Sequence, residues 1–124
     1  MAGVHSFHDL LVWHKARALA VSIYLATESF PKHEIFGLIS QMRRAAVSIV
    51  ANIAEGSGRR TSGALANHLD IANGSVAELL PLSFVAEDVG YIAASSCNDL
   101  REQITEVAKM LHALHSAIRN KISG

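Results

Sequence analysis

A regular spacing of apolar residues near the C-terminus constrains the fold of this chain more than any other feature of the sequence. Alternating steps of four and three residues separate six apolar side chains: Leu100, Ile104, Val107, Leu111, Leu114 and Ile118. This period places all six on one face of an α-helix, while Arg101, Glu106 and Lys109 fall on its other faces. A single apolar face on a long helix is typical of the seam of an antiparallel helix bundle.

Proline and glycine residues divide the whole chain into four long segments with helical patterns, over about residues 8–28, 34–55, 61–88 and 96–121. The length of 124 residues is that of one ordinary domain. We therefore expect an all-α, single-domain protein over residues 1–124, folded as an antiparallel up-down-up-down four-helix bundle.

The ends of these predicted helices carry recognisable capping residues. Gly56 is expected to end the second helix in a left-handed conformation, and Thr61 or Ser62 to cap the start of the third. Ser95 or Ser96 is expected to cap the start of the fourth helix. Pro81 removes one backbone hydrogen bond from the third helix, so we expect a kink there.

The composition indicates a subunit interface. Hydrophobic residues make up 50% of the chain and charged residues only 18%, which leaves few polar groups to cover a small domain. We therefore expect a homo-oligomer. Lysine plus arginine and aspartate plus glutamate both number 11, so no overall field attracts nucleic acid, and any basic surface is local.

The sequence favours a cytoplasmic protein. Cys97 is the single cysteine, so the chain has no disulfide framework. The N-terminus lacks a basic region, and the longest apolar run, over residues 18–26, is far shorter than the ~20 residues of a membrane span. We expect neither a signal peptide nor a transmembrane helix.

The predicted second helix has a polar line almost opposite its apolar face. Its members are Gly37, Gln41, Arg44, Ser48, Asn52 and Glu55. A face that meets solvent would contain more lysine and glutamate, so this line is expected to pack against another element. In the third segment Ser75 and Glu78 lie among apolar residues, and we expect Glu78 to pair with Arg44 or Asn52. The alternative is that Glu78 reaches solvent.

The stretch "SIVANIAEGSGRR", residues 48–60, raises the question of a phosphate-binding loop. It lacks the lysine of such a loop, and a helix rather than a strand precedes it, so it is expected to be a helix–helix junction. Arg59 and Arg60 then lie at the start of the third helix, where backbone N–H groups favour anions. Together with Arg43 and Arg44 they form the candidate site for RNA or DNA.

Other residues give weaker evidence for a metal-binding, catalytic or nucleic-acid-binding site. The pairs His5 with His8 and His112 with His115 have spacings that place two side chains on one helical face, but neither pair has a third local ligand, so no metal or other cofactor is expected. Cys97 near a helix start has no evident base. The aromatic residues are expected to belong to the bundle core: Phe7, Trp13, Phe30 and Phe36.

Three stretches resemble a known family. They are "FHDLLVWHKA" (7–16), "FPKHEIFGLISQMRRAAVSIVANIAEGSGR" (30–59) and "ANGSVAEL" (72–79), and they are similar to the 23S rRNA-intervening-sequence, or S23, family. The residues that match the family pattern are Gln41, Arg43, Arg44, Ser48, Asn52, Glu55, Gly56, Arg59, Gly74, Ser75 and Glu78. The stretch "ELLPL" (78–82) departs from the pattern through its proline.

The resemblance implies a four-helix bundle that assembles as a homopentameric barrel, without an established activity. It also implies a relation to the accessory variability determinants of diversity-generating retroelements, which act with a reverse transcriptase. We therefore expect a non-enzymatic assembly module whose partners are further copies of itself and a protein that handles nucleic acid. The alternative is direct RNA or DNA binding by the four arginines. The third segment is acidic, with Asp70, Glu78, Glu87 and Asp88 and no lysine or arginine, which weakens that alternative.

Overall fold

The structure is a computed structural model that describes residues 6–123. Its helices are α1 (Leu11–Thr27), α2 (Leu38–Ser57), α3 (Ser62–Asp88) and α4 (Ala94–Ser123), and 3₁₀ turns at Phe7–Asp9 and Lys32–Glu34 precede α1 and α2. The described range contains no strand. The prediction of an all-α fold with four helices is therefore confirmed.

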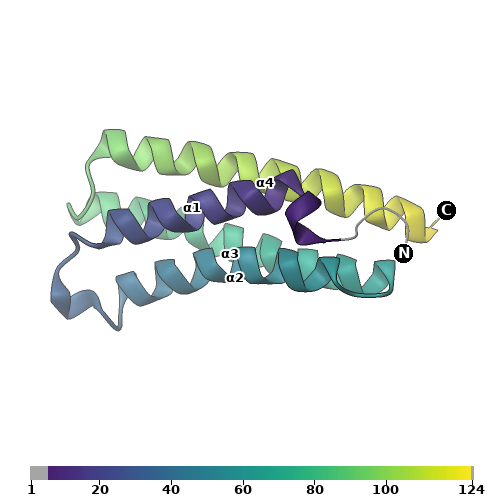
Figure 1. Ribbon diagram of the computed structural model, residues 1–124. Helices are drawn as coiled ribbons and strands as arrows, with labels where there is room; N and C mark the ends of the chain where they lie inside the picture. The colour runs from purple at the N-terminus through teal and green to yellow at the C-terminus, as the bar shows by residue number, and fades with distance from the viewer. Residues whose placement is uncertain (1–5, 124) are drawn as a thin grey trace.

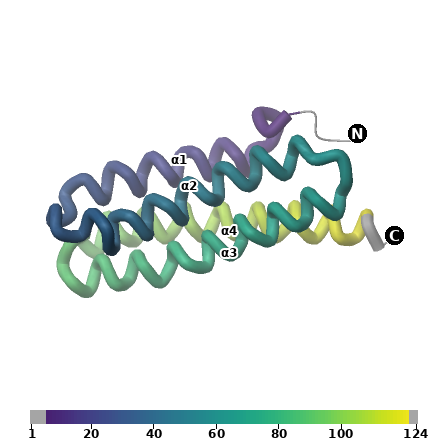
Figure 2. Tube along the Cα trace, turned by 90° about the horizontal axis from the view of Figure 1, so that it is seen from below, coloured from purple at the N-terminus to yellow at the C-terminus, as the bar shows by residue number. Residues whose placement is uncertain are grey.

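The four helices lie along one common direction (Figures 1 and 2). The α1–α2 and α3–α4 connections lie at one end of the molecule, and the short α2–α3 connection lies at the other end (Figure 1). Each helix packs against its neighbours in the order α1, α2, α3, α4, and α4 returns to α1. The faces between α1 and α2 and between α2 and α3 are therefore adjacent and share α2.

The helix boundaries differ from the predicted ones. Residues 7–9 form a 3₁₀ turn and Leu10 is extended, so α1 starts at Leu11 rather than at residue 8. The 3₁₀ turn at Lys32–Glu34 likewise delays the start of α2 to Leu38. The fourth helix starts earlier than predicted, at Ala94, so Ser95 and Ser96 lie inside its first turn and do not cap it. The two 3₁₀ turns therefore contain residues that the predicted first and second helices had included.

The α2–α3 junction confirms one predicted cap and corrects another. Thr61 is the N-cap of α3, and its hydroxyl accepts a hydrogen bond from the Ala64 N–H at 3.1 Å. Gly56 is not a left-handed cap, because α2 continues to Ser57, and its C-cap, Gly58, has a right-handed conformation with a φ of −86°. In the described chain Gly90, before α4, is the glycine with positive φ, at 83°.

Close helix packing explains Gly56 instead. A Cβ at this position would lie 2.7 Å from the Cβ of His68 and 3.1 Å from Cδ1 of Leu65. Both neighbours belong to α3. Gly56 therefore lets α2 and α3 approach each other without a side chain between them.

The core lies between the four helices and contains the apolar seams of α2 and α4. On α4, Leu100, Ile104, Val107 and Leu111 are buried, as the period predicted. On α2 the buried series includes Ile39, Met42, Ala46, Ile49 and Ile53, but Ile35 is half exposed because it precedes the helix. The contribution of α3 includes Leu65, Leu69, Ala72, Val76 and Leu79. Pro81 lies inside α3, which continues to Asp88.

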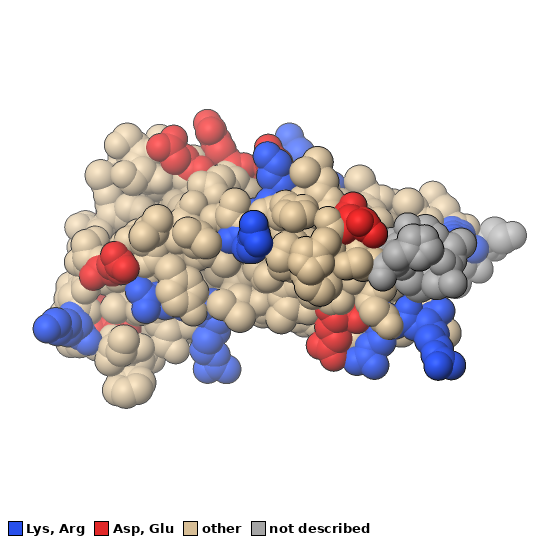
Figure 3. All heavy atoms as spheres, viewed as in Figure 1, with Lys and Arg blue, Asp and Glu red and all other residues tan. Residues whose placement is uncertain are grey.

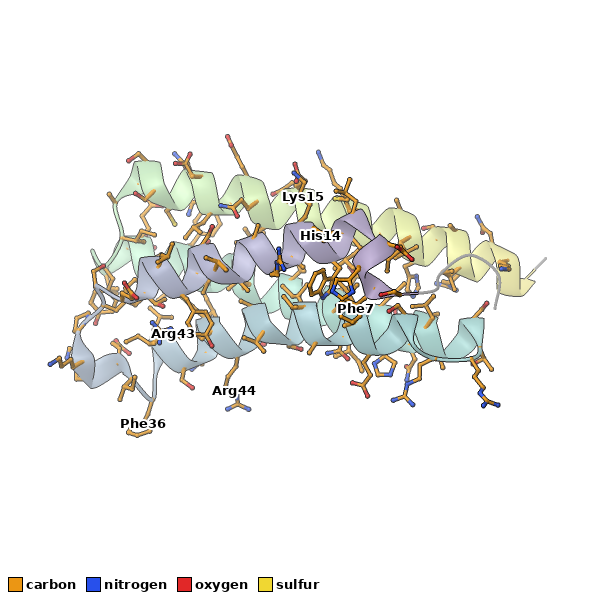
Figure 4. The ribbon with its side chains drawn as sticks, viewed as in Figure 1. Phe7, His14, Lys15, Phe36, Arg43 and Arg44 are labelled. Carbon is orange, nitrogen blue, oxygen red and sulfur yellow. The ribbon has the colours of Figure 1, made fainter. Side chains whose placement is uncertain are left out.

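The aromatic residues behave in two ways. Trp13 and Phe30 are buried and Phe7 packs against the core, as predicted. Phe36 is 93% exposed, so its assignment to the core was wrong. It follows the 3₁₀ turn at Lys32–Glu34 and projects away from the molecule (Figure 4). Its apolar surroundings at the end of a predicted helix suggested burial, but α2 starts two residues later.

The Glu34 side chain joins two segments of the chain at one end of the bundle. Its Oε1 accepts the Leu38 N–H at the start of α2 at 3.1 Å, and its Oε2 accepts the Tyr91 hydroxyl at 2.9 Å. The Leu38 N–H and the Tyr91 hydroxyl lower the pKa of Glu34, and the same carboxylate raises the pKa of Tyr91. Because the N-cap Gly37 has no side chain, Glu34 satisfies a backbone donor of α2 and ties it to the α3–α4 connection.

Helix α3 is long and apolar enough to cross a membrane by length and composition. The core helix of a soluble bundle meets the same criterion, and α3 buries one side against α2 and α4. The cytoplasmic location stays a prediction.

Candidate functional site

An apolar groove lies on the face between α1 and α2. It is a hollow of about 330 Å³ whose lining residues are Arg17, Ala20, Val21, Tyr24, Leu25, Val47 and Val50. We call this set the α1–α2 groove. Three of its side chains stand well out of the core, since Val21 is 54% exposed, Leu25 62% and Val47 45%.

The sequence of α1 explains why this groove faces outward. Leu19 and Ile23 occupy the core side of the helix and are fully buried. Val21 and Leu25 lie roughly half a turn away from them, so they cannot enter the same core. Helix α1 is therefore apolar on more than one face, which is unusual for a bundle helix whose outer face meets only water.

Arg43 holds α1 and α2 together beside the groove. Its Nε donates to the Thr27 hydroxyl at 2.9 Å and its Nη2 to the Tyr24 carbonyl at 3.3 Å. The guanidinium also lies over the Tyr24 ring, 4.6 Å from its centroid. Thus Arg43 points toward α1, whereas Arg44 points away from the bundle (Figure 4).

A polar cleft of about 410 Å³ lies on the adjacent face, between α2 and α3, and contains much of the predicted polar line. Its lining residues are Gln41, Arg44, Ala45, Ser48, Ser75 and Glu78. The Ser75 hydroxyl donates to the Ser48 hydroxyl at 2.8 Å. Asn52 Nδ2 donates to the Ser48 carbonyl at 2.9 Å, and Asn52 Oδ1 lies 3.0 Å from His68 Nδ1. The half-buried part of the line therefore packs against α3, as predicted.

The predicted pairing of Glu78 with Arg44 or Asn52 was wrong. Within the described residues Glu78 makes no hydrogen bond and no ion pair, and its side chain is exposed, as is that of Arg44. His68, which the sequence reasoning missed, is the partner of Asn52 instead. Arg44 and Glu78 stand on the two rims of the cleft, where both remain accessible to a second molecule.

An exposed stripe follows one side of α3. It consists of Ile71, Glu78 and Val85 in the helix and Val89 directly after it, and we call these four residues the α3 stripe. Steps of seven and four residues place them in one row. Ile71, Val85 and Val89 are each about half exposed, at 47%, 48% and 55%.

The four candidate arginines do not form one cluster. Arg43 and Arg44 lie in the first half of α2, and Arg59 and Arg60 lie beyond its other end, about 20 Å further along at 1.5 Å per residue. Arg59 Nη2 forms an exposed ion pair with Glu55 Oε1 at 2.8 Å, so a carboxylate of the same chain already holds it. Arg60 is exposed beside the start of α3. Charged side chains lie scattered over a largely uncharged face of the molecule (Figure 3).

Cys97 is a core residue. Its side chain is fully buried, its thiol donates to the Ser83 carbonyl at 3.1 Å, and Arg101 Nη1 donates to Sγ at 2.8 Å. Burial raises the pKa of the thiol more than the nearby Arg101 lowers it. Arg101 is itself paired with Glu87 at 2.7 Å. This arrangement fastens α4 to α3 and leaves the thiol unreactive.

His14 and His115 serve as structural partners. His14 donates from Nε2 to the His8 carbonyl at 2.9 Å. His115 Nε2 lies 2.7 Å from Asp70 Oδ1, without the alignment of a hydrogen bond, and so joins α4 to α3. No three His, Cys, Asp or Glu side chains gather as a metal site within residues 6–123. His5 lies outside the described residues.

Comparisons with known proteins agree with this architecture. The model of the family described as 23S rRNA-intervening sequence protein matches residues 8–113. A crystal structure of a protein of unknown function from the S23 ribosomal protein family of Bacteroides thetaiotaomicron has a similar fold, with a TM-score of 0.78 at 24% sequence identity. The match covers 86% of this chain and 96% of that one. A search of curated proteins found no match.

Proposed function

The chain belongs to the 23S rRNA-intervening sequence protein family, and we propose that it is a non-enzymatic module that works by assembling with further copies of itself. The observation that supports this proposal is the α1–α2 groove, where apolar side chains of two helices form one exposed surface. Contiguous exposed apolar surface of this kind marks interaction sites in soluble proteins. In its more specific form, which we call the finer form, the proposal is that up-down-up-down bundles assemble as a homopentameric barrel.

The chemistry of the polar groups supports a role without catalysis. The Cys97 thiol is buried and bonded to the core, and Asn52, Ser48 and Ser75 bond to one another or to His68. Their hydrogen bonds join neighbouring helices. In the cleft between α2 and α3, the Ser75 hydroxyl donates to the Ser48 hydroxyl rather than to a base.

Molar mass in solution tests the proposal. Size-exclusion chromatography with multi-angle light scattering on the full chain at micromolar concentration is expected to give a uniform multiple of the 13.3 kDa subunit, five-fold in the finer form. A uniform monomer over the same concentration range would contradict self-assembly.

Direct binding of RNA or DNA is the second candidate function. It is supported by the exposed Arg60 next to Thr61, the N-cap of α3, because backbone donors and arginine favour phosphate together. This function predicts binding that weakens steeply with salt and is lost in the double variant Arg59→Ala/Arg60→Ala. Failure of wild type to shift structured RNA or duplex DNA at low salt would exclude it.

We further propose a protein partner that handles nucleic acid. Capture of that partner by the immobilised chain, with and without ribonuclease, separates direct contact from bridging by RNA. Loss of the partner after ribonuclease treatment would contradict a direct protein contact.

A further inference from the structure

Two of the exposed apolar surfaces of this chain differ in form. The α1–α2 groove is a hollow between two helices. The α3 stripe is an exposed row on a single helix. A convex helical row filling a groove between two other helices is the usual geometry of helix packing.

The two surfaces also carry opposite charge. Arg17 lines the groove and Arg44 stands beside it on α2. Helix α3 has four acidic residues and no lysine or arginine, and Glu78 lies in the middle of the stripe. Neither Arg44 nor Glu78 forms an ion pair within the described chain. Two stripes facing each other would bring like charges together, whereas a stripe in a groove brings opposite charges together.

The heights of these residues along the bundle agree as well. The bonds Ser48–Ser75 and Asn52–His68 fix the register of α2 against α3, and this register places Arg44 level with Glu78, as their shared cleft shows. The same register places Val50 level with Ile71, and Val47 between the levels of Ile71 and Glu78.

The same register applies at the end of the molecule where Ile35 and Phe36 lie. Ile35 and Phe36 lie near the level of Val85 and Val89, since Glu34 bonds to Tyr91 just beyond them. Copies related by a rotation about an axis parallel to the helices keep the same heights. Glu78 of one copy then lies level with Arg44 of the next copy. Val85 and Val89 lie level with Ile35 and Phe36, so that Phe36 gains an apolar neighbour.

On the premise that the chain self-assembles, we propose that the α3 stripe of one copy packs along the groove side of the next copy. Ile71 then lies in the α1–α2 groove, Glu78 pairs with Arg44, and Val85 and Val89 pack against Ile35 and Phe36. This contact is heterologous, because it joins two different surfaces. The two surfaces lie on adjacent faces that share α2, so repetition of the contact turns around α2, and it closes a ring when the rotation between neighbouring copies divides a full turn. Helix α2 then lines the inside of that ring.

Two surface variants and their mixture test this arrangement. Val47→Asp disables the groove and Val85→Asp disables the stripe, and both sites are half exposed, so each variant is expected to fold. Each alone is expected to be a monomer by light scattering. Leu11→Asp, at a site 63% exposed and outside both surfaces, is the matched control and is expected to keep the wild-type mass.

The mixture distinguishes a heterologous contact from a symmetric one. In an equimolar mixture, the intact groove of Val85→Asp accepts the intact stripe of Val47→Asp, and the pair cannot grow further. A one-to-one dimer is therefore expected at the highest soluble concentration. Absence of this dimer, with both single variants folded by circular dichroism, would overturn the proposal.

Charge reversal tests the predicted pair. Arg44→Glu is expected to weaken assembly at least ten-fold in concentration, and the double variant Arg44→Glu/Glu78→Arg is expected to restore it. If wild type assembles but Val47→Asp and Val85→Asp assemble equally well, this contact is wrong and the proposed function stands. If wild type is a monomer, the proposed function itself fails.

Discussion

Gly56 shows how a single residue decides the distance between two helices. Its position in the sequence, after a helical pattern and before a second glycine, is typical of a helix end. In the structure it is helical, and a Cβ there would meet His68 and Leu65 of α3. The residue type was informative, but the reason for it was steric rather than conformational.

Gly56→Ala is therefore expected to destabilise the protein by about 1–3 kcal/mol, as overpacking of a tight contact does. Gly63→Ala is the matched control, because a Cβ at Gly63 meets no atom within 4 Å. It is expected to leave stability unchanged or raise it by up to about 1 kcal/mol. Chemical denaturation of both variants measures the difference, and equal stability of the two would contradict the packing argument.

At the scale of elements, the short 3₁₀ turn at Lys32–Glu34 has a larger role than its length suggests. Its Glu34 carboxylate satisfies the Leu38 N–H of α2 and accepts the Tyr91 hydroxyl from the α3–α4 connection. Phe30 packs against the Tyr91 ring, with centroids 5.2 Å apart. Segments far apart in the chain are thereby joined at one end of the bundle (Figure 1).

Tyr91→Phe is expected to lower the melting temperature at neutral pH, because it removes one of the two bonds that lower the pKa of Glu34. A carboxyl group with a lowered pKa adds stability above its ordinary pKa of 4.5 and loses it as the pH falls through the folded value. The difference from wild type should therefore shrink as the pH falls below 4.5. Thermal unfolding followed by circular dichroism at several pH values measures it.

Tyr24→Phe serves as the control for this variant, since the Tyr24 hydroxyl forms no hydrogen bond within the described structure. The difference in melting temperature between Tyr24→Phe and wild type is expected to stay the same at all pH values. A constant deficit of Tyr91→Phe across the acidic range would mean that the ring, not the bond to Glu34, is responsible.

For the whole molecule, the main feature is exposed apolar surface in a chain with no net charge. The α1–α2 groove and the α3 stripe both remain uncovered in one subunit. Neutral proteins with exposed apolar surface have little electrostatic repulsion to keep copies apart. Assembly is therefore expected to contribute to the stability of the fold.

The melting temperature of wild type should consequently rise with protein concentration, because association stabilises the folded state by mass action. Val47→Asp, which disables the groove, should melt at a temperature that does not depend on concentration. Calorimetry over a hundred-fold range of concentration, on the order of 1 to 100 μM, checks this. A wild-type melting temperature independent of concentration would indicate that assembly does not stabilise the subunit.

The sequence by itself determined the helices, the buried seams of α2 and α4 and the Thr61 cap, because these follow from the period of apolar residues and from local hydrogen bonding. The family match agrees with the residues that first suggested it. What the sequence left open was which polar residues meet across helices. Only the tertiary structure showed that Asn52 bonds to His68, that Glu78 and Arg44 remain unpaired, and that Phe36 projects outward. The physical reason is register: a helical period fixes the face on which a side chain lies, but its height opposite another helix depends on how the two helices pack.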